Sequence, residues 1–400
     1  MKDDRPVSIP RRRMLQGSAA ALAAAGTAGL SGRAVAQSKP LPGYVSWKHG
    51  PSMIVHSSNT LETKRSAFGT SGITPGDRLY IRNNVSPPPD SIVASRDDWQ
   101  VEIAGVRNPG VLTVGQLKQL GIGTVAMVLQ CSGNGRAFFP HKPSGTKWTV
   151  GAAGCVVFSG VPVRAVVEAM GGLADGVNFM TGTGGEKIPP GIDRKSVLVE
   201  RSVPLAAMHD ALLAWEMNGE PMPLAHGGPL RMVVPGYTGV NNVKYVDRLA
   251  FTAAESDARI QATRYRMVPH GGKGSPSLPS VLQMSVKSWI NSPNPDHASL
   301  RAGWTQIHGV AFGGMDAVRS VAVSLDGGGS WQEAQLVGPD MGKYAWRQFV
   351  LAANLKAGAY TLVSRATDAA GNEQPRERPE NAAGYNNNGW ADHGVRITVG

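Results

Sequence analysis

The chain has only two cysteines among its 400 residues, Cys131 and Cys155. Neither belongs to a Cys-x-x-Cys-His motif, so the sequence predicts no covalently attached haem in this chain. In an oxidising compartment the two thiols could simply form one disulfide. That structural role is the first alternative for both residues.

Charged residues are also scarce, at 17% of the chain, whereas glycine (50 residues) and proline (28 residues) are abundant. This composition favours many turns and short strands and argues against long helices. The length suggests two domains more readily than one.

The apolar run near the N-terminus, Gly17–Leu30, is too short and too rich in alanine and glycine to span a bilayer. It follows Arg11-Arg12-Arg13 and precedes the small residues Ala34-Val35-Ala36, an order typical of a signal peptide. The paired arginines resemble a twin-arginine signal. We therefore expect residues 1–36 to be cleaved, and the mature protein to be soluble and periplasmic with no membrane span.

The formal charge of the full chain is +11, and cleavage after Ala36 would remove six cations and two anions, leaving +7. A positive charge of this size attracts anionic substrates or acidic protein partners. No block of lysine and arginine with interleaved aromatic residues occurs, so we do not expect nucleic-acid binding.

Apolar periodicity predicts short elements of both kinds between residues 77 and 275. Residues 37–76 are expected to form an irregular N-terminal arm. The expected strands are residues 78–82, 99–106 and 125–129, and the expected helices are residues 114–120, 161–170 and 202–208. Because these elements lack a regular strand–helix–strand rhythm, the pattern favours an α+β fold over a doubly wound sheet.

The glycine- and proline-rich segment 271–279 is the best linker candidate. Beyond it the sequence alternates with period two, and strands are expected at 320–327, 360–366 and 395–399. Short strands with regular turns over residues 276–400 predict an immunoglobulin-like β-sandwich.

Cys131 differs from Cys155 in its setting. The strand expected at 125–129 delivers the Cys131 thiol to a loop of small residues that ends at Arg136. A thiolate on an open loop beside a fixed positive charge suits either a nucleophile or a ligand for a soft metal. Cys155 stands in the apolar run 154–158 and is expected to pack in the core.

Five segments, in this order, resemble those of the molybdenum domain of the sulfite oxidase family. They are Arg82-Asn83-Asn84, Gln130 to Arg136, Ala214 to Gly219, His226 to Arg231, and Val234 to Tyr245. The resemblance covers most of residues 77–400. It implies a molybdopterin-binding catalytic domain at residues 77–275 and a β-sandwich dimerisation domain at residues 276–400.

The resemblance also implies roles for individual residues. Cys131 would bind molybdenum beside a pyranopterin, the Mo-molybdopterin cofactor. Arg82, Arg136, Tyr265 and Trp148 would line the substrate pocket. The residues expected to hold the cofactor are Arg82, Asn83, Asn84, Cys131, His226, Arg231, Asn242, Val243 and Lys244.

The activity implied is the periplasmic oxidation of sulfite to sulfate, with electrons passed singly to an external c-type cytochrome. Sulfite is a small anion, so guanidinium groups near the thiol suit its binding. A homodimer is expected by analogy with the family's C-terminal domain.

The chain departs from the family pattern at several positions. Gly135 stands where many members have arginine, Asn84 where histidine is common, and Asn387 or Asn388 near the place of a further arginine. One cation fewer would weaken anion binding or shift the preferred substrate. Two alternatives therefore stay open: a sulfane dehydrogenase of a thiosulfate-oxidising complex, and a non-catalytic periplasmic binding protein.

Overall fold

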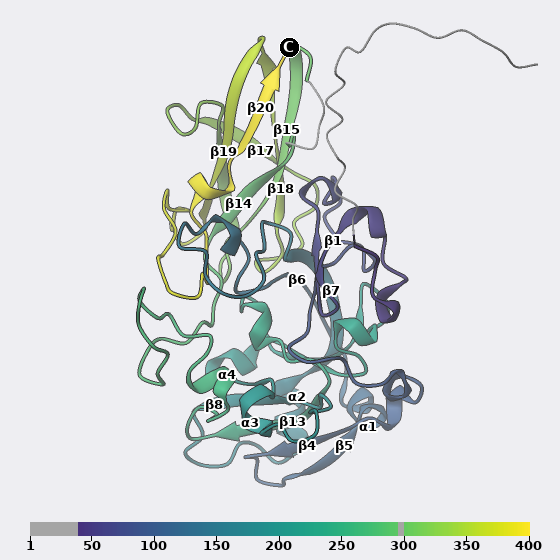
Figure 1. Ribbon diagram of the computed structural model, residues 1–400. Coiled ribbons are helices and arrows are strands. Elements are labelled where there is room, and N and C mark those ends of the chain that lie inside the picture. The colour runs from purple at the N-terminus through teal and green to yellow at the C-terminus, as the bar shows by residue number, and fades with distance from the viewer. Residues whose placement is uncertain (1–38, 295–299) are drawn as a thin grey trace, which may run out of the picture. The chain divides into compact units, whose positions relative to one another are not determined.

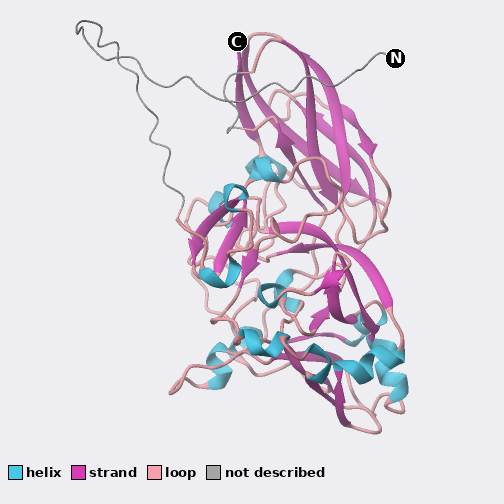
Figure 2. Cartoon of the chain, turned by 90° about the vertical axis from the view of Figure 1, so that its right-hand side faces the viewer, coloured by secondary structure: helices cyan, strands magenta, loops and turns pink. Residues whose placement is uncertain are grey.

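The computed structural model describes residues 39–294 and 300–400, so the predicted signal peptide lies outside the described residues. Strands predominate and the helices are short, as the composition predicted (Figures 1 and 2). The α-helices of the described chain are α1 (Val114–Leu117), α2 (Val163–Ala169), α3 (Arg194–Val197) and α4 (Arg259–Ala262).

The N-terminal segment forms a small antiparallel sheet, so its assignment as an irregular arm is wrong. Its strands, in sheet order, are β1 (Met53–Ser57), β2 (Thr60–Thr63) and β3 (Ile81–Arg82). All four residues of β2 are buried, so β2 gives no alternating signal in the sequence. β3 is shorter than the strand expected at 78–82, because the backbone N–H groups of Arg78 and Leu79 both donate to the carbonyl of Pro75 and form a turn.

Two larger sheets follow. The first has the order β11-β10-β7-β6 and also carries β12 paired with β10; its strands are β6 (Gly123–Gln130), β7 (Ala153–Pro162), β10 (Leu212–Met217), β11 (Glu220–Pro221) and β12 (Arg231–Val233). The second has the order β5-β4-β13-β8-β9; its strands are β4 (Gln100–Ala104), β5 (Gly110–Thr113), β8 (Phe179–Gly184), β9 (Glu200–Pro204) and β13 (Val246–Thr252). Most neighbours in these sheets are antiparallel and the helices are short, which confirms the α+β class.

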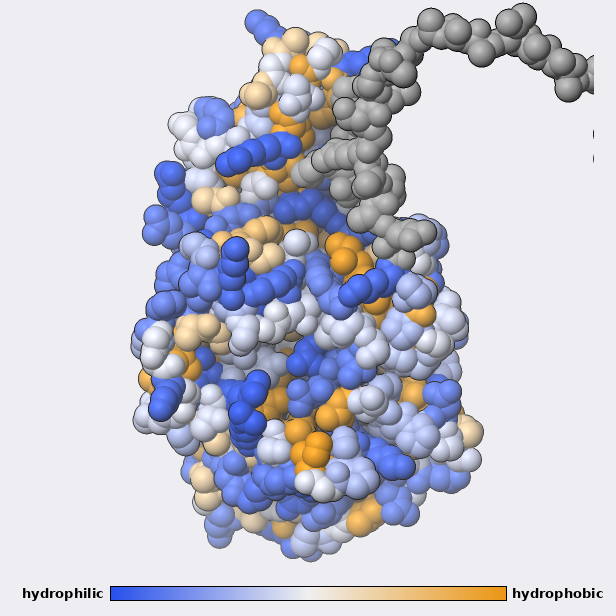
Figure 3. Space-filling model, viewed as in Figure 1, coloured by the Kyte–Doolittle hydropathy of each residue, from blue (hydrophilic) through white to orange (hydrophobic). Residues whose placement is uncertain are grey.

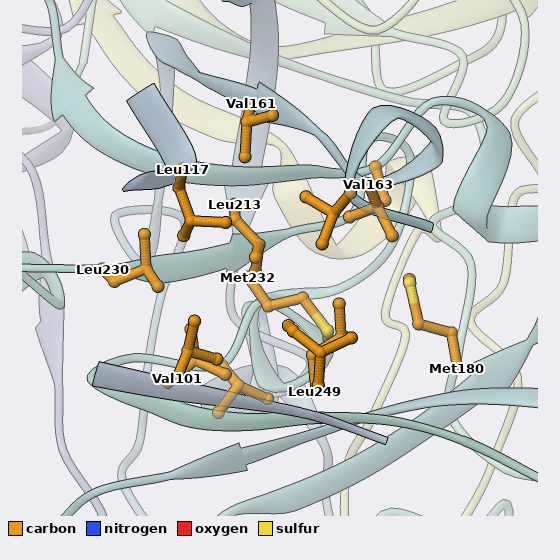
Figure 4. Close-up of a cluster of buried hydrophobic side chains, with 14 of the residues drawn as sticks. Val101, Leu117, Val161, Val163, Met180, Leu213, Leu230, Met232 and Leu249 are labelled. Atoms are coloured by element: carbon orange, nitrogen blue, oxygen red, sulfur yellow. The ribbon is translucent and has the colours of Figure 1, made fainter. Parts of the chain in front are cut away.

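A shared apolar core lies between these two sheets. Val101 of β4, Leu213 of β10 and Leu249 of β13 are fully buried and point toward one another (Figure 4). α2 adds the buried face Val163, Val166 and Val167 that the 3.6-residue period predicted. Removing these side chains from water is the main force that holds the two sheets together.

One predicted helix is wrong. Residues 202–204 belong to β9, and only a short 3-10 turn, Leu205–His209, follows them. Ser202 pairs with Thr181 of β8, and their hydroxyl oxygens lie 2.7 Å apart in the buried sheet. This buried hydrogen bond, together with the sheet ladder, outweighs the local helical pattern.

The C-terminal region is a sheet of seven antiparallel strands in the order β14-β15-β18-β17-β16-β19-β20. Its strands are β14 (Lys287–Ser292), β15 (Gly303–Phe312), β16 (Val318–Ser324), β17 (Gln332–Val337), β18 (Arg347–Leu355), β19 (Gly358–Asp368) and β20 (Val395–Val399). The strands expected at 320–327, 360–366 and 395–399 correspond to β16, β19 and β20. Apolar residues from all seven strands form one core, as expected of a β-sandwich.

The face shown in Figure 3 is mostly hydrophilic, with hydrophobic residues in small separate groups. Within residues 39–294 and 300–400, no helix combines the length and hydrophobicity needed to cross a bilayer.

Candidate functional site

Cys131 lies directly after β6, as the sequence predicted. β6 pairs with β7 over eight residue pairs, and the backbone N–H of Cys131 donates to the carbonyl of Ala152 at 2.9 Å. Both cysteines are free, so the structure holds no Cys131–Cys155 disulfide. Cys155 is buried in β7, and burial raises the pKa of its thiol to about 12, which keeps it protonated and unreactive.

The loop after Cys131 is closed by short-range hydrogen bonds. The side chain of Asn134 donates to Gln130 Oε1 at 2.9 Å and accepts from the backbone N–H of Ala152. Gly135 has φ = 90°, and a Cβ there would lie only 2.9 Å from Asn387 Cβ. A larger residue at 135 would therefore strain the backbone and collide with Asn387.

Asn387 also donates a hydrogen bond from Nδ2 to the carbonyl of Gly135 at 3.0 Å. Two of the positions at which the chain departs from the family pattern are thus in direct contact. Because Gly135 has no side chain, Asn387 can fill the space beside it.

Two cavities meet at Cys131. The inner one measures about 680 Å³ and the outer one about 1700 Å³. Six residues line both: Arg82, Asn83, Asn84, Cys131, Ile260 and Tyr265. Concave sites with a few converging polar groups are where proteins bind cofactors and small ligands.

The inner cavity brings together all of the residues predicted to hold a cofactor. Besides the shared ones, these are His226, Arg231, Asn242, Val243 and Lys244. Every predicted cofactor-binding residue therefore lines one chamber, although they come from segments far apart in the chain.

Cations gather in this chamber without carboxylate partners. Arg231 is buried and donates to the carbonyls of His226 and Asn242, and Lys244 Nζ donates to Asn83 Oδ1 at 2.7 Å. Neither forms a salt bridge among the described residues. Burial, followed by the charges of Arg231 and Arg82, holds the pKa of Lys244 well below its usual range.

Lys48, which the sequence analysis missed, adds a further cation. Its Nζ lies 2.7 Å from His226 Nε2 and donates to the carbonyls of Gly76 and Leu79. Burial and the charge of Lys48 lower the pKa of His226 well below its usual value, so the imidazole is neutral at pH 7. Lys48 lies in the segment expected to be irregular, and no motif marked it.

Buried cations without anionic partners are costly, because the desolvation of each charge is not repaid. A ligand carrying a phosphate would supply the missing negative charge. The donors of Arg231 and Lys244 therefore fit the phosphate of a pterin cofactor, and the Cys131 sulfur fits a soft metal.

Glu186 is a second residue that the sequence analysis missed. It lines the inner cavity, and its Oε2 atom has no hydrogen-bond partner among the described residues. Burial raises the pKa of Glu186 to about 7, with Lys244 opposing the shift. A carboxyl that is half-protonated at neutral pH can donate or accept a hydrogen bond with a bound ligand.

The outer cavity contains the two predicted pocket arginines. Arg82 is the last residue of β3, whose pairing with β2 fixes its position. Its guanidinium donates to the carbonyl of Asn83. Arg136 donates from Nε to the carbonyl of Ala383 and from Nη1 to that of Thr146. Both residues line the cavity beside Cys131, which suits the binding of an anion.

Tyrosines also surround the thiol. Tyr265 lines both cavities, and Tyr80, which the sequence analysis missed, lines the inner one. Burial, followed by the negative charge of a Cys131 thiolate, raises the pKa of Tyr80 well above its usual value, so its hydroxyl stays protonated.

Trp148 lines neither cavity. Its side chain is fully buried and packs edge-on against His56 and Tyr80. The following loop is held by Glu62, whose Oε1 accepts hydrogen bonds from the backbone N–H groups of Thr149 and Gly151. Trp148 therefore supports the cavity wall from behind in this structure.

No group of three or more histidine, cysteine, aspartate or glutamate side chains suitable for a metal ion occurs in the described part of the chain. Cys131 is thus the protein ligand that we expect for a metal. A cofactor that brings its own sulfur ligands would fit such a site.

Comparison with protein families gives two matches. Residues 87–260 match the oxidoreductase molybdopterin binding domain, and residues 279–399 match the Mo-co oxidoreductase dimerisation domain. The matched ranges fall within the predicted domains 77–275 and 276–400. The predicted combination of a molybdopterin domain and a dimerisation domain is confirmed, although the exact boundaries stay a prediction.

Among curated proteins, the chain is 30% identical over 367 residues to a sulfite oxidase of Arabidopsis thaliana, covering 85% of this chain and 91% of that protein. It is 31% identical to the mitochondrial sulfite oxidase of Mus musculus (82% of this chain, 62% of that protein). It is also 31% identical to an inducible NADH nitrate reductase of Glycine max (80% of this chain, 39% of that protein). The chain thus spans 62% and 39% of the last two proteins, less than two thirds of each.

Among solved structures, the sulfane dehydrogenase SoxCD of Paracoccus pantotrophus is similar, with a TM-score of 0.71 and 24% identity over 86% of this chain and 88% of that one. This likeness supports the same overall fold.

Proposed function

Because the chain belongs to the sulfite oxidase family of molybdopterin-dependent oxidoreductases, we propose that it oxidises sulfite to sulfate at a molybdenum centre bound by Cys131. The observation that carries this proposal is the position of the Cys131 thiol, which lies where a cation-rich inner chamber opens into an arginine-lined outer one.

The inner chamber would hold the pterin and its phosphate through Arg231, Lys244 and neutral His226, with Lys48 supporting His226 from behind. When bound, the molybdenum cofactor supplies the two-electron redox chemistry. The sulfur of Cys131 would anchor it at the boundary between the chambers. Glu186 would exchange a proton with a polar group of the pterin, because its pKa of about 7 makes both protonation states accessible.

The outer chamber would bind the substrate. Arg82 and Arg136 supply N–H donors for the oxygens of sulfite, and the Tyr265 hydroxyl adds a third donor group. Each turnover converts sulfite and one water molecule into sulfate, two protons and two electrons. The cationic wall attracts the substrate sulfite and the product sulfate alike. Sulfate would therefore leave by exchange with solvent through the wide outer chamber.

We further propose that the enzyme acts in the periplasm, exported by a twin-arginine signal, and passes its electrons one at a time to a separate c-type cytochrome. The sequence of residues 1–36 and the absence of a haem-attachment motif in the chain support this. The dimerisation domain supports a homodimer.

The test begins with protein purified after export, measuring molybdenum content and sulfite-dependent reduction of cytochrome c. Cys131→Ser should lower the rate at least about 100-fold, because a hydroxyl is a poor ligand for a soft metal. Cys155→Ala is the matched control: this thiol is buried in β7 and should leave the rate within about threefold of wild type.

Normal sulfite turnover by Cys131→Ser would contradict the ligand assignment. Folded, exported wild-type protein without molybdenum would instead favour a non-catalytic binding protein.

The sulfane dehydrogenase alternative is favoured by one observation: the outer chamber opens to solvent and leaves room for a substrate larger than sulfite. The same assay with protein-bound sulfane sulfur separates the two activities. Turnover of that substrate and not of sulfite would replace our proposal with the alternative.

A further inference from the structure

Four side chains form a continuous column beside Cys131. The Arg136 guanidinium carbon lies 5.3 Å from the ring centre of Tyr385. The ring of Tyr385 stacks on that of Tyr265, with centroids 5.0 Å apart and planes inclined by 16°. On the far side, the guanidinium carbon of Arg201 lies 5.7 Å from the ring centre of Tyr265. The column therefore alternates cation, two rings and cation.

We propose that Tyr385, supplied by the C-terminal region, is a positioning residue of the outer chamber that holds Arg136 and Tyr265 in their anion-binding orientations. This inference rests on the proposed function and concerns how the same site binds its anion.

Tyr265 needs such support because its backbone is strained. Its φ is 48°, in the left-handed region that a bulky residue rarely adopts. No hydrogen bond to the Tyr265 hydroxyl occurs among the described residues. The ring contacts with Tyr385 and Arg201 are therefore the interactions that orient this side chain.

Tyr385 is itself held firmly. Asn381 brackets its backbone, accepting from the Tyr385 N–H and donating to the Tyr385 carbonyl, both at 2.9 Å. The next residue, Asn386, donates its backbone N–H to the carbonyl of Ser132 in the Cys131 loop at 2.9 Å. Tyr385 is thus tied both to the C-terminal region and to the thiol-bearing loop.

Arg136 gains its orientation from the same segment. Its Nε donates to the carbonyl of Ala383, and its guanidinium carbon lies 5.3 Å from the centre of the Tyr385 ring. Gly384 has φ = 66°, and a Cβ there would come within 2.9 Å of Arg136 Cγ. The segment 383–385 thus packs closely around the arginine and leaves its Nη2 edge for an anion.

Arg201 adds a fixed positive charge behind Tyr265. It is fully buried and donates only to neutral oxygens, those of Asn241, Ile260, Ser280 and Val281. Burial lowers its pKa to about 10, so it stays charged at neutral pH. A buried cation behind the ring makes the Tyr265 hydroxyl a stronger hydrogen-bond donor to an anion.

The test measures anion binding directly, with sulfate as the probe and calorimetry on the exported holoprotein. Tyr385→Leu removes the ring and should weaken sulfate binding about tenfold, because two ring contacts are lost. The KM for sulfite should rise by a similar factor while kcat stays within about threefold. Tyr385→Phe keeps both ring contacts and should bind sulfate within about twofold of wild type.

The control is Tyr360→Leu, in β19 of the same region. Tyr360 packs against the β-sandwich core and makes no contact with the column. Its loss should leave sulfate binding unchanged even if the melting temperature falls. If Tyr385→Leu does not accumulate as folded protein, Tyr385→Met, whose unbranched side chain adapts more readily to the site, carries the same expectation.

The inference is overturned if Tyr385→Leu binds sulfate like the wild type, or if Tyr385→Phe is as impaired as Tyr385→Leu. It also fails if the wild type binds no sulfate. A wild type that binds sulfate but does not oxidise sulfite would sink the proposed function alone, and the Tyr385 variants would still decide the inference.

Discussion

Cations have different surroundings in the C-terminal sandwich and in the inner chamber. In the sandwich region, Arg365 pairs with Glu373 at 2.8 Å, and Arg378 pairs with Asp392 at 2.7 Å. At the chamber, Lys244 and Arg231, and Lys48 behind His226, form no salt bridge among the described residues and contact only neutral oxygens or an imidazole. The difference shows where the chain is built to receive a negative charge from outside, since stability alone would favour pairing each cation.

The strongest test of this comparison is to remove a cation from the inner chamber. Lys244→Met should lower the molybdenum content of exported protein at least about tenfold, because one donor to the cofactor phosphate is lost. The protein without cofactor should be as stable as wild type or more stable, because a buried unpaired charge has been removed. Metal analysis and thermal melting measure the two effects.

The control for Lys244→Met is Lys343→Met, which removes a half-exposed cation of the sandwich region that lies 3.9 Å from Asp210. Full molybdenum content in both variants would show that Lys244 does not hold the cofactor.

Lys287 of β14 is an exception, because it is a buried cation of the sandwich with no salt-bridge partner among the described residues. It therefore tests the comparison within the sandwich. Its Nζ has no hydrogen-bond partner in the protein, and it lies 5.7 Å from the Trp289 ring centre. Burial lowers its pKa to about 7, with Asp392 opposing and Arg65 reinforcing the shift. His393 is the other titratable group that faces it, and the charge of Lys287 helps to lower the pKa of His393.

Between pH 7 and about 10.5, the usual lysine pKa, the unfolded state binds more protons at Lys287, so its contribution makes the wild type more stable as pH rises. Below pH 7 both states are protonated and the penalty is fully present. Lys287→Met should therefore stabilise the protein by about 1–3 kcal/mol at pH 6–7, with a smaller gain at pH 10. Denaturant unfolding at both pH values measures this, and a loss of stability at pH 6 would contradict it.

The smallest effect is expected at an exposed pair. Glu373→Gln removes the partner of Arg365, whose guanidinium also lies 4.5 Å from the ring centre of Trp331. Because both charges are largely solvated, the free energy of unfolding should change by less than about 1 kcal/mol. A change above about 2 kcal/mol in denaturant unfolding would show that paired surface cations matter more than the comparison implies.

The sequence predicted the site best where short motifs coincide with a strand end. Cys131 after its strand, Arg82 before its asparagines, and the segments at 226–231 and 242–244 all line the cavities as expected. Glycine-rich turns and apolar strands leave local signals, so these features can be found from sequence.

The missed residues share a different property: they reach the site from regions without a motif. Lys48 comes from the N-terminal segment, whose strand β2 is buried on both faces and shows no alternation. Tyr385 comes from an irregular loop of the C-terminal region. Their roles depend on long-range packing, which local patterns do not encode.

The walls of the two chambers draw on residues from Ser57 to Tyr385, most of the length of the described chain. During translation the wall at the thiol loop stays open until the ribosome has made the segment that follows residue 380. A cofactor can therefore be enclosed only in a finished polypeptide. If the chain is exported after folding, as we propose, the cofactor is loaded before translocation.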